Sequence, residues 1–435
     1  MKPALKNNHR YAQSEALLER AERSIPLGAQ TFSKSYTQYP RGVSPYFITH
    51  GKGSHVWDAD RHEYIDFVNS LAAITLGYCD PDVDAAVKKQ MQNGTIFSLS
   101  HPIEMTVAEK MQTLIPGAER VRFGKNGSDA TAGAIRLARA FTGKDHILAC
   151  GYHGWQDWYI GSTTKNKGVP KSTQNLTHSF PFNDLHALEK LLNDKKGSVA
   201  AVIMEPMNIT EPEEGYLQAV KELAHKHGAI LIFDETVTGF RYDIGGAGKH
   251  FGVTADLSTF GKGMANGYPI SAIVGRADIM KLMEEIFFSF TFGGETLSLA
   301  AALATMEKLE REPVIETLAT QGDKIMTQTQ ALIDQYDLGE TISLAGKSCW
   351  SFLMIKDFEE YDSMTIKTLF MQEMFENGIL SLGSHNLSYA HSDEDIAKLM
   401  TAYNDFMKKL KMIFEQKSMD QHLKCEPNKP LFKVR

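Results

Sequence analysis

The chain has 435 residues, of which 43% are hydrophobic and 23% charged, with a formal net charge of −7. This length exceeds what one small core can organise, so two or more domains are expected. The negative charge excludes the basic surface of a nucleic-acid-binding protein. The start is polar, without the apolar core of a secretory signal, and no run of about 18 apolar residues could span a membrane. The composition therefore predicts a cytoplasmic globular protein.

Four widely spaced cysteines contain no CxxC pair, so neither a disulfide framework nor a zinc site is expected: Cys79, Cys150, Cys349 and Cys425. Residues 10–25 have the periodicity of an amphipathic helix, and 26–45 form a segment rich in Gly, Pro and aromatic residues. Short apolar stretches between 46 and 67, split by turns, predict a small meander of strands. A helix is expected from Pro81 to Met91.

Helical and strand patterns alternate between residues 100 and 296. Helices are predicted at 102–115, 128–142, 184–193 and 215–227, and strands at 146–149, 199–204, 229–233 and 270–274. Such alternation indicates βαβ units around a mostly parallel sheet. The run at 199–204 is apolar at every position, as expected of a strand with helices on both sides.

The last third of the chain has a different pattern. A helix from Leu297 to about Arg311 leads into predicted helices at 314–335, 364–377 and 393–415, with a strand near 349–356. This mixture predicts a second, α+β domain. The polar tail from Gln416 to Arg435 is expected to be a loose end or an arm that lies on a neighbour.

The chemical signal centres on one strand and the lysine that follows it. The apolar run 229–233 ends at Asp234, and Lys262 lies farther on between Gly261 and Gly263. A carboxylate at the end of a strand, followed by a lysine on a glycine-flanked turn, suits an enzyme that uses pyridoxal 5′-phosphate (PLP). In such enzymes the lysine forms a Schiff base with the cofactor, and an aspartate keeps a proton on the pyridine nitrogen.

The stretches DETVTGFR, which begins at Asp234, and FGKGMANG, which contains Lys262, resemble the class III (fold-type I) PLP-dependent aminotransferases. Within that family they are most similar to the glutamate-1-semialdehyde 2,1-aminomutase branch. The resemblance implies an α/β fold with a mostly parallel central sheet, helices on both faces and a smaller α+β domain. It divides the chain into an N-terminal segment (1–65) that contributes to the small domain and substrate pocket, a large PLP-binding domain (66–310), and a C-terminal small domain with a polar tail (311–435).

Further motifs of this family occur in the family's order. KNGSDA stands where the family has a phosphate-binding loop, YHG where its tyrosine lies against the cofactor ring, and Glu-Pro at 205–206 where its glutamate lies near the ring. Thr291 aligns with a threonine that reaches the phosphate of the neighbouring subunit, so a homodimer is implied. The cofactor-binding residues implied by the resemblance are Gly127, Ser128, Tyr152, His153, Glu205, Asp234, Thr236, Val237, Lys262 and Thr291.

Taken singly, each of these residues has an ordinary structural interpretation. Lys262 could be a surface charge, Asp234 a loop acid, Ser128 a helix cap and His153 a core histidine. The specificity comes from the combination, which runs from about Tyr11 to Ile413. No metal site is expected.

The substrate side departs from the aminomutase pattern. Lys34 stands where the aminomutase has an arginine for the substrate carboxylate, Leu71 where it has a tryptophan, and Gly383 where it has a glutamate. A lysine cannot give the flat bidentate grip of an arginine. Lys34 and Asn208 are assigned to substrate binding, in a roomier and less acid-specific pocket than that of the aminomutase.

The resemblance implies an aminotransferase that moves an amino group from an amino-acid donor to a carbonyl acceptor. Gly383 and Lys34 suggest an acceptor such as an oxidised sugar or an amino-alcohol-derived carbonyl. Lys262 and Asp234 are the catalytic residues. The main alternative is an intramolecular 2,1-aminomutase, and racemisation or decarboxylation would use the same residues. A catalytically silent protein that binds a partner is a different class, against which the intact Lys262 and Asp234 argue.

Overall fold

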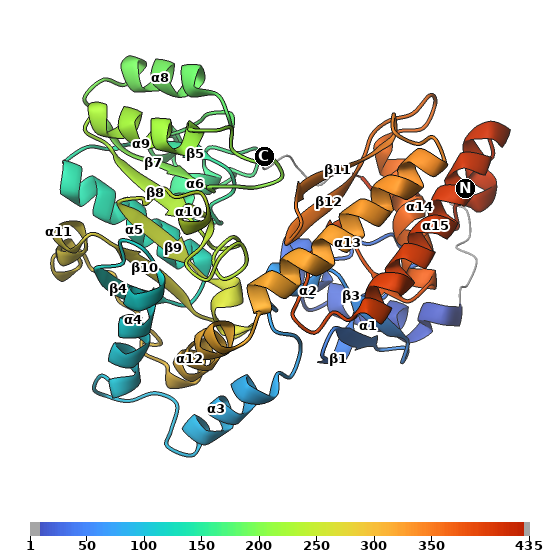
Figure 1. The fold of residues 1–435 in the computed structure, drawn as a ribbon, viewed down its shortest axis with the longest axis horizontal. Helices are drawn as coiled ribbons and strands as arrows, with labels where there is room; N and C mark the ends of the chain where they lie inside the picture. The colour runs from blue at the N-terminus through green and yellow to red at the C-terminus, as the bar shows by residue number, and fades with distance from the viewer. Residues whose placement is uncertain (1–8, 430–435) are drawn as a thin grey trace. The chain divides into compact units, whose positions relative to one another are not determined.

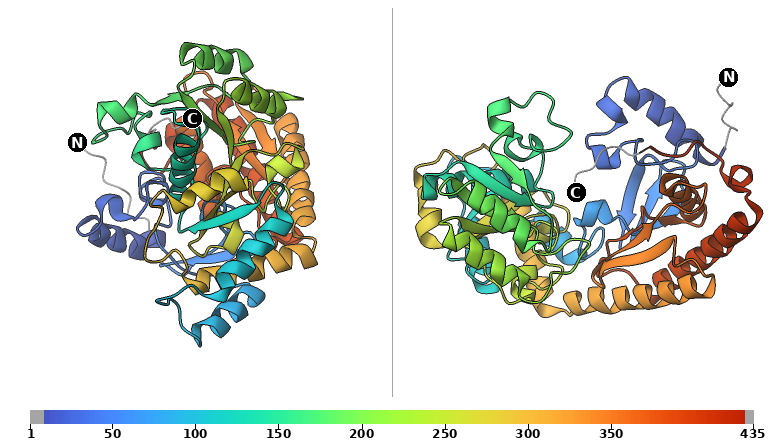
Figure 2. Two further views of the ribbon diagram at one scale, coloured as in Figure 1. Left: turned by 90° about the vertical axis from the view of Figure 1, so that its left-hand side faces the viewer. Right: turned by 90° about the horizontal axis from the view of Figure 1, so that it is seen from above.

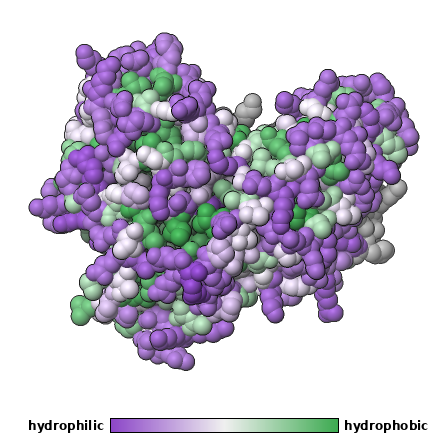
Figure 3. All heavy atoms as spheres, in the orientation of Figure 1, coloured by the Kyte–Doolittle hydropathy of each residue, from purple (hydrophilic) through white to green (hydrophobic). Residues whose placement is uncertain are grey.

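The computed structural model describes residues 9–429, which cluster into two compact units (Figure 1). The large unit contains Ala72–Leu76 and Asp80–Glu316. The small unit contains 9–71, Gly77–Cys79 and 317–429. Each unit has its own sheets and helices, described separately below. The surface in the orientation of Figure 1 is mostly hydrophilic with hydrophobic side chains between (Figure 3).

The large unit is built on a seven-stranded sheet in the order β4-β10-β9-β8-β7-β5-β6. Its strands are β4 (Arg120–Gly124), β5 (His146–Cys150), β6 (Thr177–Ser179), β7 (Val199–Met204), β8 (Ile230–Asp234), β9 (Leu257–Phe260) and β10 (Ser271–Gly275). Strands β6, β5, β7, β8 and β9 pair in parallel, whereas β10 is antiparallel to both β9 and β4. The predicted mostly parallel sheet is confirmed.

Helices cover both faces of this sheet because its central strands are apolar on both sides (Figures 1 and 2). Helix α5 (Gly127–Thr142) packs on the face formed by alternate residues such as Ala201, Ile203 and Ile232. Helices α8 (Leu185–Asp194) and α9 (Tyr216–Lys226) pack on the opposite face, against Val202, Met204 and Phe233. The period of two along each strand thus divides the core into two apolar layers.

Three more helices complete the large unit: α3 (Pro81–Met91), α4 (Pro102–Leu114) and α12 (Thr296–Arg311). Asp80 caps the first turn of α3, and its other oxygen lies 2.7 Å from Nζ of the buried Lys308 on α12. This buried ion pair ties the two helices together. The short elements are α6 (Asp157–Ile160), α7 (Lys171–Gln174), α10 (Ala247–His250), η4 (Lys262–Ala265), α11 (Ala277–Met280) and η5 (Lys281–Glu284).

The small unit contains two small sheets. One has the order β1-β2-β3-β13 and the other β11-β12-β14. The strands are β1 (Ile48–Lys52), β2 (His55–Asp58), β3 (Glu63–Asp66), β11 (Ile342–Lys347), β12 (Trp350–Ile355), β13 (Ile379–Leu380) and β14 (Ser384–His385). Strands β1, β2 and β3 form the predicted antiparallel meander.

Long helices accompany these sheets: α1 (Ala12–Glu22), α14 (Ser363–Glu376) and α15 (Asp393–Gln416), with α13 (Val314–Gln335) entering from the large unit. Short elements are η1 (His9–Tyr11), η2 (Pro26–Gly28), η3 (Phe32–Lys34), α2 (Asn69–Ala72) and α16 (Met419–His422). The described part of the tail lies on α14 of its own chain, because Lys424 N donates to Gln372 and Asn428 N donates to Thr368. The end of the predicted tail, 430–435, lies outside the described residues.

Candidate active site

The predicted cofactor residues of the large unit follow strand ends at one edge of the sheet. Asp234 ends β8, Glu205 follows β7, Tyr152 follows β5, Lys262 follows β9, and α5 begins after β4. Because these strands share one direction, their carboxyl ends lie along the same edge. In open α/β sheets this edge is where ligands bind.

Asp234 is buried and surrounded by hydrogen-bond donors. His153 Nδ1 lies 2.8 Å from Oδ2, and Oδ1 accepts from Thr236 Oγ1 at 2.6 Å and Thr259 Oγ1 at 3.1 Å. Burial by itself would raise the pKa of Asp234, but the bonds from His153 and Thr236 hold that pKa below its ordinary value. The carboxylate is therefore ionised at neutral pH, as the partner of a protonated pyridine nitrogen must be.

His153 is held at both ring nitrogens. Its Nδ1 faces Asp234, and its Nε2 lies 3.2 Å from the carbonyl oxygen of Cys150 at the end of β5. Thr131 Oγ1 donates to the His153 carbonyl at 2.8 Å, which fixes the backbone as well. The ring is buried and held on both sides, so it orients Asp234 from a fixed position.

Lys262 begins the 3-10 helix η4 with a φ of 42°, in the left-handed region that non-glycine residues seldom adopt. Asn266 caps the C-terminal end of this element with a φ of 46°, and its Oδ1 accepts from Thr75 N at 3.0 Å and Leu76 N at 2.9 Å. A Cβ on Gly263 would lie 2.5 Å from Thr75 Oγ1, so only glycine allows this approach. Backbone outliers of this kind are concentrated at functional sites.

The start of α5 forms a cradle for an anion. Asn126 and Asp129 cap the helix reciprocally, using the N–H groups of Lys125, Asn126 and Asp129. Among residues 9–429, the N–H groups of Gly127 and Ser128 have no acceptor. Free N–H groups at a helix N-terminus favour phosphate.

Gly154 shapes the other side of this cradle. Its φ is 102°, and a Cβ there would overlap Ser128 Oγ, which also accepts from Trp155 N at 3.2 Å. Lys125 Nζ lies 2.9 Å from Glu295 Oε2, so the loop is tied to the N-cap of α12. The residues present therefore fit the phosphate of PLP at α5 and its ring nitrogen at Asp234.

The other predicted residues are placed as follows. The Tyr152 ring is 40% exposed and lies edge-on to Tyr159. Glu205 is buried beside Gly151, where a Cβ would lie 2.5 Å from Glu205 Oε2, so only glycine leaves room for this carboxylate. Asn208 is buried, with its Oδ1 accepting from Thr210 N, and Val237 is partly buried after β8. These residues lie after β5, β7 and β8, at the same edge as Asp234.

Two predicted residues lie elsewhere. Thr291 is exposed in the loop before α12. Lys34 belongs to the small unit, where its Nζ lies 3.4 Å from Ser70 Oγ. Ser70 is part of α2, whose four residues all have positive φ, including Leu71 at 62°. Lys34 thus lies beside α2, which contains Ser70 and Leu71, in the small unit.

Sequence reasoning missed Thr259 and Asn266. Thr259 is the register partner of Asp234 on the adjacent parallel strand, so the pairing of β8 with β9 brings its hydroxyl to the carboxylate. The Asn-Gly pair at 266–267 is a signal for left-handed backbone, but nothing local points to Thr75 as a partner. Across residues 9–429, no group of three or more His, Cys, Asp or Glu side chains could hold a metal ion.

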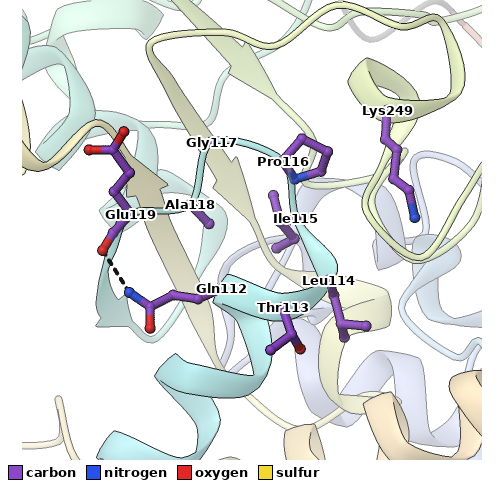
Figure 4. A pocket seen from close by; sticks show the side chains of 9 residues that line it. All are labelled: Gln112, Thr113, Leu114, Ile115, Pro116, Gly117, Ala118, Glu119 and Lys249. Carbon is purple, nitrogen blue, oxygen red and sulfur yellow. Dashed lines mark hydrogen bonds between the residues drawn. The ribbon is translucent and has the colours of Figure 1, made fainter.

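A pocket of about 450 Å³ is lined by Gln112–Glu119 and Lys249 (Figure 4). Gln112 Nε2 donates a hydrogen bond to the Glu119 carbonyl within this lining. Gln112–Glu119 precede β4 and Lys249 precedes β9, at the amino edge of the sheet, whereas Asp234 and Lys262 lie at the carboxyl edge. The pocket is therefore separate from the candidate active site.

No helix among residues 9–429 is both long and apolar enough to cross a bilayer.

A doubly wound sheet with a buried ionised aspartate, a strained lysine and an anion cradle at its carboxyl edge defines a fold-type I PLP-dependent enzyme. The chain belongs to the class III aminotransferase family, whose model matches residues 38–406. The predicted family, fold class, enzyme class and cofactor are thereby confirmed.

Individual relatives span nearly the whole chain. The 3-aminobutyryl-CoA aminotransferase of Cloacimonas acidaminovorans (strain Evry) is 35% identical over 92% of this chain and 98% of the relative. The glutamate-1-semialdehyde 2,1-aminomutase of Polynucleobacter necessarius subsp. necessarius (strain STIR1) is 33% identical over 92% and 99%. The solved structure of the Sphingopyxis sp. MTA144 FumI protein, in its PLP internal aldimine form, matches with a TM-score of 0.86 at 26% identity, over 96% of this chain and 99% of that one.

Proposed function

We propose that this enzyme is a two-substrate aminotransferase, with Lys262 and Asp234 as its catalytic residues. The observation that carries the proposal is that a buried, ionised Asp234 ends β8 and that Lys262 follows β9, the adjacent parallel strand. Bound PLP supplies a carbonyl that takes up the amino group and a ring that accepts electrons. The protein supplies the position, the charge and the proton transfers.

Each residue has a task that its surroundings support. The carboxylate of Asp234, oriented by His153, keeps a proton on the pyridine nitrogen. The N–H groups of Gly127 and Ser128 hold the phosphate. Lys262 Nζ would move a proton from the donor carbon that bears the amino group to C4′ of the cofactor, acting as general base and then as general acid. In the second half-reaction it would move a proton from C4′ to the acceptor carbon that receives the amino group.

We propose further that one of the two substrates has its nitrogen on a carbon that is not next to a carboxylate. A lysine at position 34 gives a weaker grip on a carboxylate than an arginine. One relative is named a 3-aminobutyryl-CoA aminotransferase, and in 3-aminobutyryl-CoA the amino group is two carbons from the acyl carbonyl. Acceptors derived from sugars or amino alcohols share this feature, and we keep them among the candidates.

The second candidate is an aminomutase, which moves an amino group within one molecule. It is favoured by the 33% identity to a glutamate-1-semialdehyde 2,1-aminomutase that covers 99% of that relative. Dependence on an amino donor separates the two candidates, because a mutase needs no second substrate.

The decisive experiment follows the visible absorption of the PLP-loaded protein while amino donors such as glutamate, alanine and 3-aminobutyrate are added in turn. A two-substrate aminotransferase loses its visible band with at least one donor and regains it with a carbonyl acceptor. A protein whose band is indifferent to every donor would favour the mutase. A protein that takes up no added PLP would contradict the proposed site.

We also infer a homodimer that works in the cytoplasm. In the large unit, residues 95–105 and 287–296 are neighbouring segments, because Thr296 N donates to Thr95 O at 2.9 Å. They expose the apolar side chains of Leu99, Met105, Phe287 and Phe292. A surface of this kind favours association. Thr291 is exposed on the second segment, which supports its proposed role in a partner's site.

The dimer has a direct test in mixed, refolded variants. If Thr291 acts in the partner's site, a Lys262→Ala chain paired with a Thr291→Ala chain has one intact site, and activity returns. If each site is made by one chain, both sites of the mixed dimer are damaged and no activity returns.

A further inference from the structure

The two oxygens of the Asp234 carboxylate are engaged unequally. Oδ1 accepts from Thr236 Oγ1 at 2.6 Å, Thr236 N at 3.1 Å and Thr259 Oγ1 at 3.1 Å. Oδ2 has His153 Nδ1 at 2.8 Å. A carboxylate offers about two acceptor positions on each oxygen. Oδ1 is therefore filled by three donors, whereas Oδ2 retains an acceptor position beside His153.

Thr236 is the residue that makes this asymmetry, since it provides two of the three donors to Oδ1. Its methyl group lies toward two glycines. A Cβ on Gly127 would lie 2.9 Å from Thr236 Cγ2 and 3.2 Å from Oγ1, and a Cβ on Gly261 would lie 3.4 Å from Cγ2. One side chain thus joins the strand end that bears Asp234 to the anion cradle and to the residue before Lys262. Its branched β-carbon restricts χ1, so hydroxyl and methyl are fixed together.

We propose that Thr236 is a positioning residue that holds Asp234 by Oδ1 and leaves Oδ2 as the oxygen that meets the pyridine nitrogen of PLP. This inference rests on the proposed role of Asp234. It assigns the hydroxyl of Thr236 to the carboxylate, and the methyl to packing beside Gly127 and Gly261. A short hydrogen bond from a hydroxyl to a carboxylate is a strong, charge-assisted one, and it lowers the affinity of that carboxylate for a proton.

Two substitutions separate the hydroxyl from the methyl. Thr236→Val keeps the shape and removes the hydroxyl, whereas Thr236→Ser keeps the hydroxyl and removes the methyl. Each variant is loaded with PLP labelled with ¹⁵N in the ring, and the ¹⁵N chemical shift is recorded at one pH. The dissociation constant for PLP is measured by titrating the cofactor-free protein.

The Val variant is expected to move the ¹⁵N resonance toward that of an unprotonated pyridine, because a more basic Asp234 withdraws the proton. Its dissociation constant for PLP rises by about three- to tenfold, a part of what a hydrogen bond to a charged group is worth. The Ser variant keeps the ¹⁵N shift of the unaltered protein, because Oδ1 keeps all three donors.

Asp234→Ala is the reference that makes every outcome informative. If it changes the ¹⁵N shift while Thr236→Val has neither effect, the inference about Thr236 is overturned and the role of Asp234 stands. If Asp234→Ala itself leaves the shift unchanged, the proposed role of Asp234 fails, and the inference fails with it. A Ser variant that behaves like the Val variant would assign the effect to packing of the methyl and overturn the role of the hydroxyl.

Discussion

Nδ1 of His153 lies 2.8 Å from Oδ2 of Asp234, although the two residues are 81 positions apart in the chain. Both side chains are buried, so the bond is protected from water and has a fixed direction. In an apolar interior a lone carboxylate would take up a proton. The contact with His153 therefore helps to keep Asp234 in the ionised form that the site requires.

Substitution of His153 should separate this hydrogen bond from the rest of the site. We expect His153→Ala to lower kcat/KM by about ten- to a hundredfold, since hydrogen bonds to charged groups are worth about 1.5–3 kcal/mol. His153→Asn is the matched control, because its amide N–H can replace Nδ1–H. Steady-state kinetics of the two PLP-loaded variants provide the measurement. Equal losses in both would show that the ring matters for packing and not for its bond to Asp234.

Gly154 offers a test of the anion cradle with a built-in control. In Gly154→Ala the new Cβ would overlap Ser128 Oγ, so the cradle must open. We expect the dissociation constant for PLP to rise by at least about tenfold. Gly168→Ala introduces a similar backbone strain, at a φ of 91°, but its Cβ meets nothing within 4 Å.

Both glycine variants should lose about 1–3 kcal/mol of stability from strain. Only Gly154→Ala should weaken PLP, as measured by titration of the cofactor-free proteins. A parallel weakening in Gly168→Ala would mean that general destabilisation, and not the cradle, controls cofactor affinity.

Asn266 provides a prediction about Lys262. Its Oδ1 accepts from Thr75 N and Leu76 N and so anchors the end of η4. Asn266→Gly keeps the left-handed backbone but removes the acceptor, and leaves two buried N–H groups unsatisfied at about 1–3 kcal/mol each. We expect kcat to fall by about tenfold or more as Lys262 loses its fixed position. Asn266→Asp keeps the acceptor, so its unfolding free energy should stay closer to that of the unaltered protein. If the Gly variant retains full kcat, the clamp has no influence on Lys262.

The sequence was sufficient for the parts of the site that depend on local pattern. The strand 229–233, its terminal Asp234 and the glycine-flanked Lys262 were predicted because apolar runs and glycines are visible locally. Strands β4 and β9 were not among the predicted strands, since RVRFG and LSTF mix polar and apolar residues over only five and four positions. Register partners are also hidden from sequence, which is why Thr259 and the contact of Asn266 with Thr75, 191 residues away, emerged only from the structure.

Glu235, next to Asp234, should give the large unit an unusual dependence on pH. Burial raises the pKa of Glu235 to about 7, although Thr238 Oγ1 and the N–H groups of Ala247 and Gly248 donate to it. Between its ordinary pKa of about 4.5 and about 7, the folded protein holds a proton that the unfolded chain has released. Stability from this group is therefore full below pH 4.5 and is lost as the pH rises through 7.

The loss amounts to about 3 kcal/mol, because each unit of pKa difference corresponds to about 1.4 kcal/mol. Asp234 affects stability in a separate pH range. Its pKa is lowered, so the stability that it contributes is lost only as the pH falls below its ordinary pKa of 3.8. The side chain in Glu235→Gln cannot ionise. The unfolding free energy of the unaltered cofactor-free protein, minus that of the variant, should therefore fall as the pH rises from 5 to 8. Urea unfolding at several pH values measures this difference. A difference that stays constant across the range would mean that Glu235 is ionised in the folded protein throughout, and that its three donors outweigh its burial.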